Sequence, residues 1–262
     1  FNLPMMYGYY IDKFWGAGKN AEETGNESYS KKVFSTTLNV QVPPEWFISD
    51  RTGVILSYEN TQIMDKKENE YLIADSVSGS NGGKLFGIGT DLLWDTRDNL
   101  FFPNEGGYQY FKLILYPGMS DNVFSLLELD VRHYRAFKPD HVLAGNFYVS
   151  STTGDVPFYK LPALGGKKMR GYFEGRYRDN FLMLLQLEYR HMFAKRFGFA
   201  VFGGAGNVSE DMISYNLKDI KYNYGGGLRF RFNEEEKVNL RVDIGIGADG
   251  NSGIYFGIEE AF

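Results

Sequence analysis

The sequence has no cysteine, only eight prolines and no long hydrophobic run. Without cysteine the chain forms no disulfide and performs no thiolate chemistry. The longest uninterrupted apolar stretch is residues 181–185, far short of the ~18–20 apolar residues that a membrane-spanning helix needs. Such a chain crosses a membrane as a closed β-barrel or not at all, because in hydrocarbon only helices and closed barrels pair every backbone N–H and C=O.

The chain also lacks an excess of positive charge, with 28 Lys and Arg against 33 Asp and Glu. The formal net charge is −5 and the sequence pI is about 5.4, so no nucleic-acid partner is expected. What is abundant is aromatic residues and glycine, with 22 Phe, 19 Tyr and 31 Gly. This composition favours strands and tight turns over helices.

Apolar residues recur with period two, the signature of strands. In residues 238–246, one face carries Val238, Leu240, Val242, Ile244 and Ile246, and the other carries Asn239, Arg241, Asp243 and Gly245. The pattern predicts an all-β fold in a single domain over residues 1–262. About twelve strands are expected, at 4–11, 32–42, 53–63, 84–95, 107–116, 123–137, 142–152, 181–192, 197–205, 220–232, 238–247 and 253–262.

These strands fit a transmembrane antiparallel β-barrel better than a soluble sandwich. Most are close to the ~9–11 residues of a tilted membrane-spanning strand, and short connections alternate with long ones, as in outer-membrane barrels. The predicted inner face is too charged for a dry core; it carries Asp91, Lys112, Glu128, Asp130, Arg132, Glu188, Arg190, Arg229, Arg231, Arg241 and Asp243. A hydrated or cross-paired lumen accommodates these charges.

Aromatic residues gather near the predicted strand ends. They are expected to form a girdle at the lipid–water boundary. The girdle residues are Trp94, Phe101, Phe102, Tyr134, Phe137, Phe193, Phe197, Phe232 and Phe262.

Three motifs follow one another in the second part of the chain. The first, at 95–107, contains Asp95, Arg97, Asp98, Phe102, Pro103 and Gly106. The second, at 165–179, contains Arg170, Gly171 and Tyr172, and the third is the terminal strand with Tyr255, Gly257 and Phe262. In this order they resemble the bacterial surface antigen barrel of the BamA/TamA outer-membrane assembly superfamily, which includes two-partner secretion transporters and barrels attached to patatin-like lipases.

The resemblance implies that the long external loop carrying Arg170-Gly171-Tyr172 folds back into the lumen, with its arginine paired on the inner wall. A planar guanidinium suits such a fixed acceptor. In the family, the acid that usually pairs with this arginine is the aspartate of a Phe-x-Asp-x-Gly stretch. This chain has Gly204 in place of that aspartate. By parity Glu188 and Asp243 point inward, and of these candidate partners Glu188 is the first choice.

The terminal strand resembles the sorting signal that the assembly machinery reads. Glu260 departs from it, since an apolar residue is expected there, and is expected on the lipid face close to the interface, where a charge costs ~0–1 kcal/mol. A further departure is that the chain has no room for the POTRA domains that precede such barrels and has fewer than the usual sixteen or so strands. It resembles a short member, or a barrel cut from a longer protein.

Signals for catalysis, cofactors and metals are weak, so no enzyme, cofactor or metal site is expected. The G-x-G-x-x-G at 245–250 leads into a hairpin loop and lacks the βαβ unit of a dinucleotide site. No G-x-S-x-G elbow exists and no spacing suggests zinc. His133 and His191 are expected to face outward, and His141 to lie in a turn.

The resemblance implies an outer-membrane barrel that assists insertion or translocation of proteins or lipids. The alternatives are a passive pore or structural barrel, and the membrane anchor of a larger patatin-like lipase. The expected location is the bacterial cell outer membrane. The expected partners are outer-membrane lipid, lipopolysaccharide and, during biogenesis, the assembly machinery, with a homo-oligomer left open. The seam between the first and last strands is expected to be weak, because Pro4 and Gly8 disfavour a ladder.

Overall fold

The computed structural model describes residues 3–19, 26–43, 49–66, 72, 77–248 and 250–262. Twelve long strands form one antiparallel sheet. They are β1 (Met5–Phe14), β2 (Glu27–Val42), β3 (Arg51–Met64), β4 (Gly82–Asp95), β5 (Glu105–Tyr116), β6 (Phe124–Lys138), β7 (His141–Gly154), β10 (Phe181–His191), β11 (Phe197–Ser209), β12 (Lys221–Asn233), β13 (Val238–Gly247) and β14 (Ser252–Ile258).

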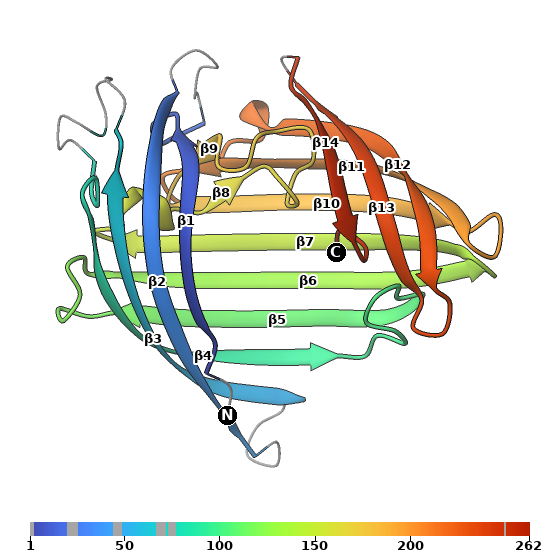
Figure 1. Ribbon diagram of the computed structural model, residues 1–262, viewed down its shortest axis with the longest axis horizontal. Helices are drawn as coiled ribbons and strands as arrows, with labels where there is room; N and C mark the ends of the chain where they lie inside the picture. Colours follow the sequence, from blue (N-terminus) through green and yellow to red (C-terminus); the bar gives the residue numbers. More distant parts are fainter. Residues whose placement is uncertain (1–2, 20–25, 44–48, 67–71, 73–76, 249) are drawn as a thin grey trace.

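The strand order follows the chain from β1 to β14, with β7 next to β10. The two strands left out, β8 (Ala163–Leu164) and β9 (Tyr177–Arg178), pair only with each other, inside the loop that joins β7 to β10. The sheet curls on itself, so that β1–β3 and β12–β14 stand in front of β5–β10 (Figure 1). Within the described residues, β1 and β14 form no ladder with each other and remain the two edges of the sheet.

The two faces of the wall differ as the period-two pattern predicts. Leu187 and Val242 are 52% and 41% exposed on the outside, whereas Glu188, Arg241 and Asp243 are at most 3% exposed inside. The prediction of an antiparallel barrel-type sheet of twelve strands, apolar outside and charged inside, is confirmed.

Strand ends differ from the sequence prediction at two instructive places. β2 begins at Glu27 rather than at residue 32, because its polar start pairs with the end of β1, Glu27 opposite Phe14. The last strand ends at Ile258 rather than at 262. Glu259 adopts a φ of 69°, a left-handed conformation that strands do not use, and the chain leaves the sheet there.

The interior is not charged along its whole length. Towards the end where β7 and β10 are joined by the long loop, several inward side chains are apolar and the loop packs on them. Leu164, Met169 and Tyr172 of the loop form one buried cluster with Leu182 and Leu184 of β10. The long loop therefore lies folded into the lumen and fills it there.

The predicted aromatic girdle is partly wrong. Phe137, Phe193, Phe197 and Phe232 are about half exposed on the outside, near the short turns. Three others are buried instead, namely Phe102, Tyr134 and Phe262. A position near a strand end does not decide which face a side chain takes.

Helical structure in the described chain is limited. It includes two 3-10 segments, η2 (Phe158–Lys160) and η3 (Leu217–Asp219). Over the described ranges, no helix has the length and apolar character required to traverse a membrane.

The exposed apolar face predicts how the chain tolerates charge. Leu187 lies near the middle of β10, so Leu187→Arg should lower the free energy of unfolding in lipid by ~2–4 kcal/mol, the cost of a cation at the bilayer midplane. Denaturant titration of the folded protein in vesicles measures this. Leu217→Arg, at an exposed position between β11 and β12, is the control and should leave stability unchanged. Equal effects of the two substitutions would contradict a lipid-facing Leu187.

Candidate functional site

The loop between β7 and β10 lies flat against the inner wall at its Arg-Gly-Tyr motif. Gly171 has a φ of 111°, and a Cβ there would lie 2.7 Å from the backbone nitrogen of Gly247. The facing wall residue has no more room for a side chain: a Cβ on Gly245 would lie 2.6 Å from the carbonyl carbon of Arg170. Glycine is required on both sides because backbone meets backbone here.

Arg170 is completely buried and pairs with both candidate acids. Its Nη2 lies 2.5 Å from Oε2 of Glu188 on β10, and its Nη1 lies 2.7 Å from Oδ2 of Asp243 on β13. The guanidinium also sits over the ring of Phe202, 3.4 Å from the ring centre. One loop side chain therefore connects three wall strands, β10, β11 and β13.

The two acids are shared with three further arginines of the wall. Arg190 Nε lies 2.7 Å from Glu188, while Arg229 and Arg241 each lie 2.5 Å from Asp243. A third carboxylate joins them, since Glu260 lies 2.8 Å from Nε of Arg229. We refer to this group as the ion cluster; its members are Arg170, Glu188, Arg190, Arg229, Arg241, Asp243 and Glu260.

The position of Glu260 corrects the sequence expectation. It does not lie on the lipid face: its side chain is 2% exposed and inside the lumen, and its Oε1 accepts a hydrogen bond from Asn239 at 3.0 Å. The turn at Glu259 reverses the parity assumed for a continuous strand. Phe262 is likewise buried, and its backbone oxygen accepts a hydrogen bond from Arg190 at 2.8 Å.

The space left by the missing acid at Gly204 is used by Asn223. A Cβ on Gly204 would lie 2.7 Å from the Asn223 Oδ1, and the Asn223 Nδ2 donates to the backbone oxygen of Arg170 at 2.5 Å. Asn223 thus holds the main chain of the motif, while Glu188 and Asp243 hold its side chain. Its inward parity on β12 was the only signal in the sequence.

Hydrogen bonds of tyrosine hydroxyls hold the two other motif residues, Gly171 and Tyr172, against the wall. The Tyr172 hydroxyl donates to the Tyr222 backbone oxygen at 2.8 Å and accepts from the Ala248 N–H at 2.7 Å. The Gly171 N–H donates to the Tyr255 hydroxyl at 2.8 Å. Tyr255, considered above as part of the terminal strand signal, thus points inward and binds the loop. Gly257, on the same strand, faces Arg241, whose Nε lies 2.9 Å from where a Cβ would stand.

The turn motif at 95–107 joins β4 to β5 at the opposite end of the lumen. Arg97 and Asp95 form a two-pronged pair at 2.8 and 2.6 Å. Phe102 is buried against Val142 and Met192. Gly106, with a φ of 96°, has no room for a Cβ beside the Thr96 carbonyl.

Asp98 organises the same turn. Its Oδ1 accepts the backbone N–H of Asn104 at 2.7 Å and of Glu105 at 3.1 Å, the two residues that directly follow Pro103. Partial burial opposes ionisation of Asp98, but these hydrogen bonds and that from the Asn104 side chain outweigh it and lower the Asp98 pKa. A lowered pKa keeps the turn anion charged at neutral pH.

The loop also contacts the other edge of the sheet. The Gly18 N–H, just beyond β1, donates to the Arg178 backbone oxygen at 2.8 Å, and Arg178 donates to the Lys13 oxygen at 3.3 Å. Because Gly171 binds Tyr255 of β14, the loop bridges β1 and β14 although these strands share no ladder in the described part of the chain.

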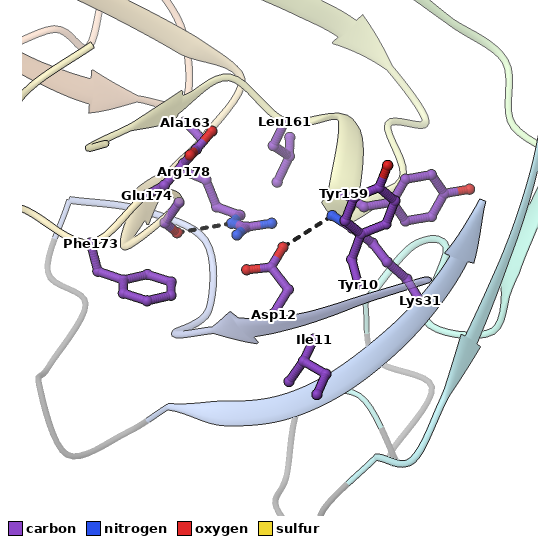
Figure 2. A pocket seen from close by; sticks show the side chains of 11 residues that line it. Tyr10, Ile11, Asp12, Lys31, Tyr159, Leu161, Ala163, Phe173, Glu174 and Arg178 are labelled. Carbon is purple, nitrogen blue, oxygen red and sulfur yellow. Dashed lines mark hydrogen bonds and ion pairs between the residues drawn. The ribbon is translucent and has the colours of Figure 1, made fainter. Parts of the chain in front are cut away.

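A cavity of about 480 Å³ lies between β1, β2 and the loop. In Figure 2, Asp12 and Lys31 from the wall face Arg178 and Phe173 from the loop. Lys31 Nζ lies 3.0 Å from the Asp12 carboxylate. Across the described ranges, no three His, Cys, Asp or Glu residues gather as a metal site.

An antiparallel sheet of twelve strands, apolar outside and filled by an ion-paired loop, defines the transmembrane β-barrel class. The model of the Omp85 superfamily domain matches residues 5–262, so the chain belongs to the Omp85 superfamily. Among solved structures it is similar to BamA from Haemophilus ducreyi lacking POTRA domains 1–3, with a TM-score of 0.68 and 14% identity. That match covers 98% of this chain and 58% of the other, and shows a shared fold. No match was found among curated proteins.

The ion cluster predicts a large effect of a nearly isosteric change. Glu188→Gln leaves Arg170 and Arg190 facing a neutral amide at a site where all three side chains are fully buried. Removing one partner of a buried ion pair costs ~3–5 kcal/mol. We expect that loss in denaturant unfolding, together with a lower temperature for the gel-mobility shift that marks barrel unfolding. Glu234→Gln is the control, because Glu234 pairs with exposed Lys195 and Arg196 at the surface and should leave both unchanged. Identical behaviour of the two variants would contradict the cluster.

Proposed function

We propose that this chain is an outer-membrane barrel that assists the insertion or translocation of proteins or lipids through the seam between β1 and β14. The observation that carries the proposal is that these two edge strands have no ladder between them in the described residues. Membership of the Omp85 superfamily supports an assembly or secretion role.

An unpaired strand edge exposes backbone donors and acceptors that require partners. An incoming polypeptide can supply them by adding a strand to the edge, a mode of recognition that main-chain hydrogen bonds make tolerant of sequence. The outward side chains next to the seam are apolar, with Ile11 79% and Phe256 77% exposed. They therefore suit a path that opens directly into lipid.

The proposal includes the bacterial outer membrane as location, with lipid and lipopolysaccharide around the wall and the assembly machinery as partner during biogenesis. It assigns no catalytic step to the chain. The alternative functions are a passive pore or structural barrel and the membrane anchor of a larger patatin-like lipase. A homo-oligomer is compatible with each of these functions.

Cross-linking the seam tests the route. Because the sequence has no cysteine, thiol reagents react only with the cysteines introduced by mutation. Ile11→Cys together with Ile254→Cys places one thiol on each edge strand, both outward by parity. Bridging them with bifunctional thiol reagents of graded length should abolish insertion of a urea-unfolded outer-membrane barrel into vesicles that hold the protein. The expected rate is that of empty vesicles.

The matched control joins β1 to its established neighbour. Tyr7 and Phe34 are register partners on β1 and β2, so bridging Tyr7→Cys to Phe34→Cys constrains the same strand without closing the seam. This variant should keep the full insertion rate. Undiminished insertion by the seam-bridged protein would exclude the proposed route.

Conductance separates this function from a passive pore. Because the loop and the ion cluster fill the lumen, the protein in a planar bilayer should pass little current. Arg170→Ala removes the side chain that ties the loop to Glu188 and Asp243 and should raise the current severalfold. A steady ohmic step of the same size in both proteins would favour the pore.

A further inference from the structure

Charge on the outer face of the wall is unevenly distributed at the end that carries the long loops. In that half of the described strands, the charged residues with outward parity are Lys13 on β1, Lys32 on β2 and Lys84 on β4. The outward positions of the same half of β5 to β14 carry no charge over the described residues. Cations that served only to hold the wall at the membrane surface would not need to gather on one side of it.

Two of these lysines flank a pair of amides. The register of the sheet sets Lys32 opposite Gln62 of β3, and it sets Asn60 of the same strand opposite Lys84. Lys32, Gln62 and Lys84 are exposed. With neighbouring strands ~4.8 Å apart and a rise of ~3.4 Å per residue, the Cα atoms of the two lysines lie about 12 Å apart. We refer to Lys32, Asn60, Gln62 and Lys84 as the polar row.

Towards the middle of the wall the polar row gives way to aromatic and then to aliphatic side chains. The rings of Phe34, Tyr58 and Phe86 follow one another across β2, β3 and β4, with centres 6.2 and 4.9 Å apart. One step further along the strands, Leu56 and Ile88 are register partners and are 47% and 51% exposed. An amphiphile standing in the leaflet beside this face presents the same order, with phosphate outermost, then sugar, then acyl chain.

The loops place two acids near the polar row, and both are hydrogen-bonded to other groups. The carboxylate of Asp65 accepts a hydrogen bond from the Tyr9 hydroxyl at 3.1 Å. That of Asp121 accepts the backbone N–H of Lys84 at 2.6 Å. Among the described residues, neither the Lys32 nor the Lys84 ammonium group takes part in an ion pair. Both cations are therefore available to an anion from outside the protein.

We propose that this outer face of β2, β3 and β4 binds the phosphorylated glycolipid of the outer leaflet, lipopolysaccharide. Lys32 and Lys84 each contact one of the two phosphates that its lipid A disaccharide carries at opposite ends, and the amides of Asn60 and Gln62 face the sugars. Cations near a layer of anionic headgroups attract it by about fivefold in affinity each. The inference rests on the outer-membrane location in the proposed function, but it does not depend on the route through the seam.

Titration of the protein in detergent micelles with lipid A that carries both phosphates tests the site, with native mass spectrometry to count the bound copies. Lys32→Gln and Lys84→Gln should each weaken binding about fivefold, and the double variant about 25-fold. Lipid A with a single phosphate should bind the unsubstituted protein about fivefold more weakly. Phosphatidylglycerol should bind more weakly than lipid A, and inorganic phosphate should not displace it.

A lysine at the opposite end of the wall provides the matched control. Lys138 is the exposed last residue of β6, so Lys138→Gln should leave lipid A binding unchanged. An unaltered temperature of barrel unfolding shows that each variant is folded. Equal loss in the Lys138 and Lys32 variants, equal affinity for phosphatidylglycerol, or displacement by inorganic phosphate would overturn the site.

The same variants keep this site distinct from the seam. In vesicles of uncharged phospholipid, which hold no lipid A, the double variant Lys32→Gln with Lys84→Gln should insert an unfolded barrel at the rate of the unsubstituted protein. A seam route that fails its own test leaves the lipid A titration unaffected, because that titration requires no insertion.

Discussion

The buried ion cluster is the interaction on which the rest of the structure depends. Four guanidiniums face three carboxylates inside the wall, and the side chains of Arg170, Glu188 and Asp243 have no exposure to solvent. Charges removed from water are tolerated only when they are paired in good geometry. The cluster meets this condition by sharing each acid between several arginines, so that no single pair can be removed without leaving its neighbours uncompensated.

The cluster explains how one loop stabilises a sheet whose edges do not pair. Arg170 fixes the loop to β10 and β13, and Tyr255 fixes it to β14. At its other end Arg178 fixes it to the end of β1. The loop thereby spans the seam from inside, by side-chain contacts that can separate without breaking a ladder. The proposed route through the seam requires contacts that separate in this way.

Much of the fold was predictable because alternate residues of each strand face two different environments, lipid on the outside and the polar lumen on the inside. Leu187 and Val242 face out and Glu188 and Asp243 face in, and each of the twelve predicted strands has a counterpart in the sheet. Parity fails where the backbone leaves the strand. Glu260 was expected on the lipid face because no local sequence pattern predicts the left-handed conformation of Glu259. β2 begins earlier than predicted because its first residues are polar, show no period-two alternation, and are held in the strand by pairing with β1.

Contacts across distant strands were the least predictable part of the site. Glu188 and Asp243 were accessible as inward acids, but Asn223 holds the Arg170 backbone only because Gly204 on the neighbouring strand leaves room for it. His141 was expected in a turn but is the first residue of β7, where its ring stacks on that of His191. This contact depends on the register of β7 with β10 across the inserted loop, which no local spacing encodes.

If Arg170 and the wall acids act as one unit, a double-mutant cycle measures their coupling. Arg170→Met, Asp243→Asn and the double variant would be unfolded in denaturant in the same vesicles. We expect a coupling free energy of about 1–3 kcal/mol between the two positions. Additivity of the two single effects to within about 0.5 kcal/mol would contradict it.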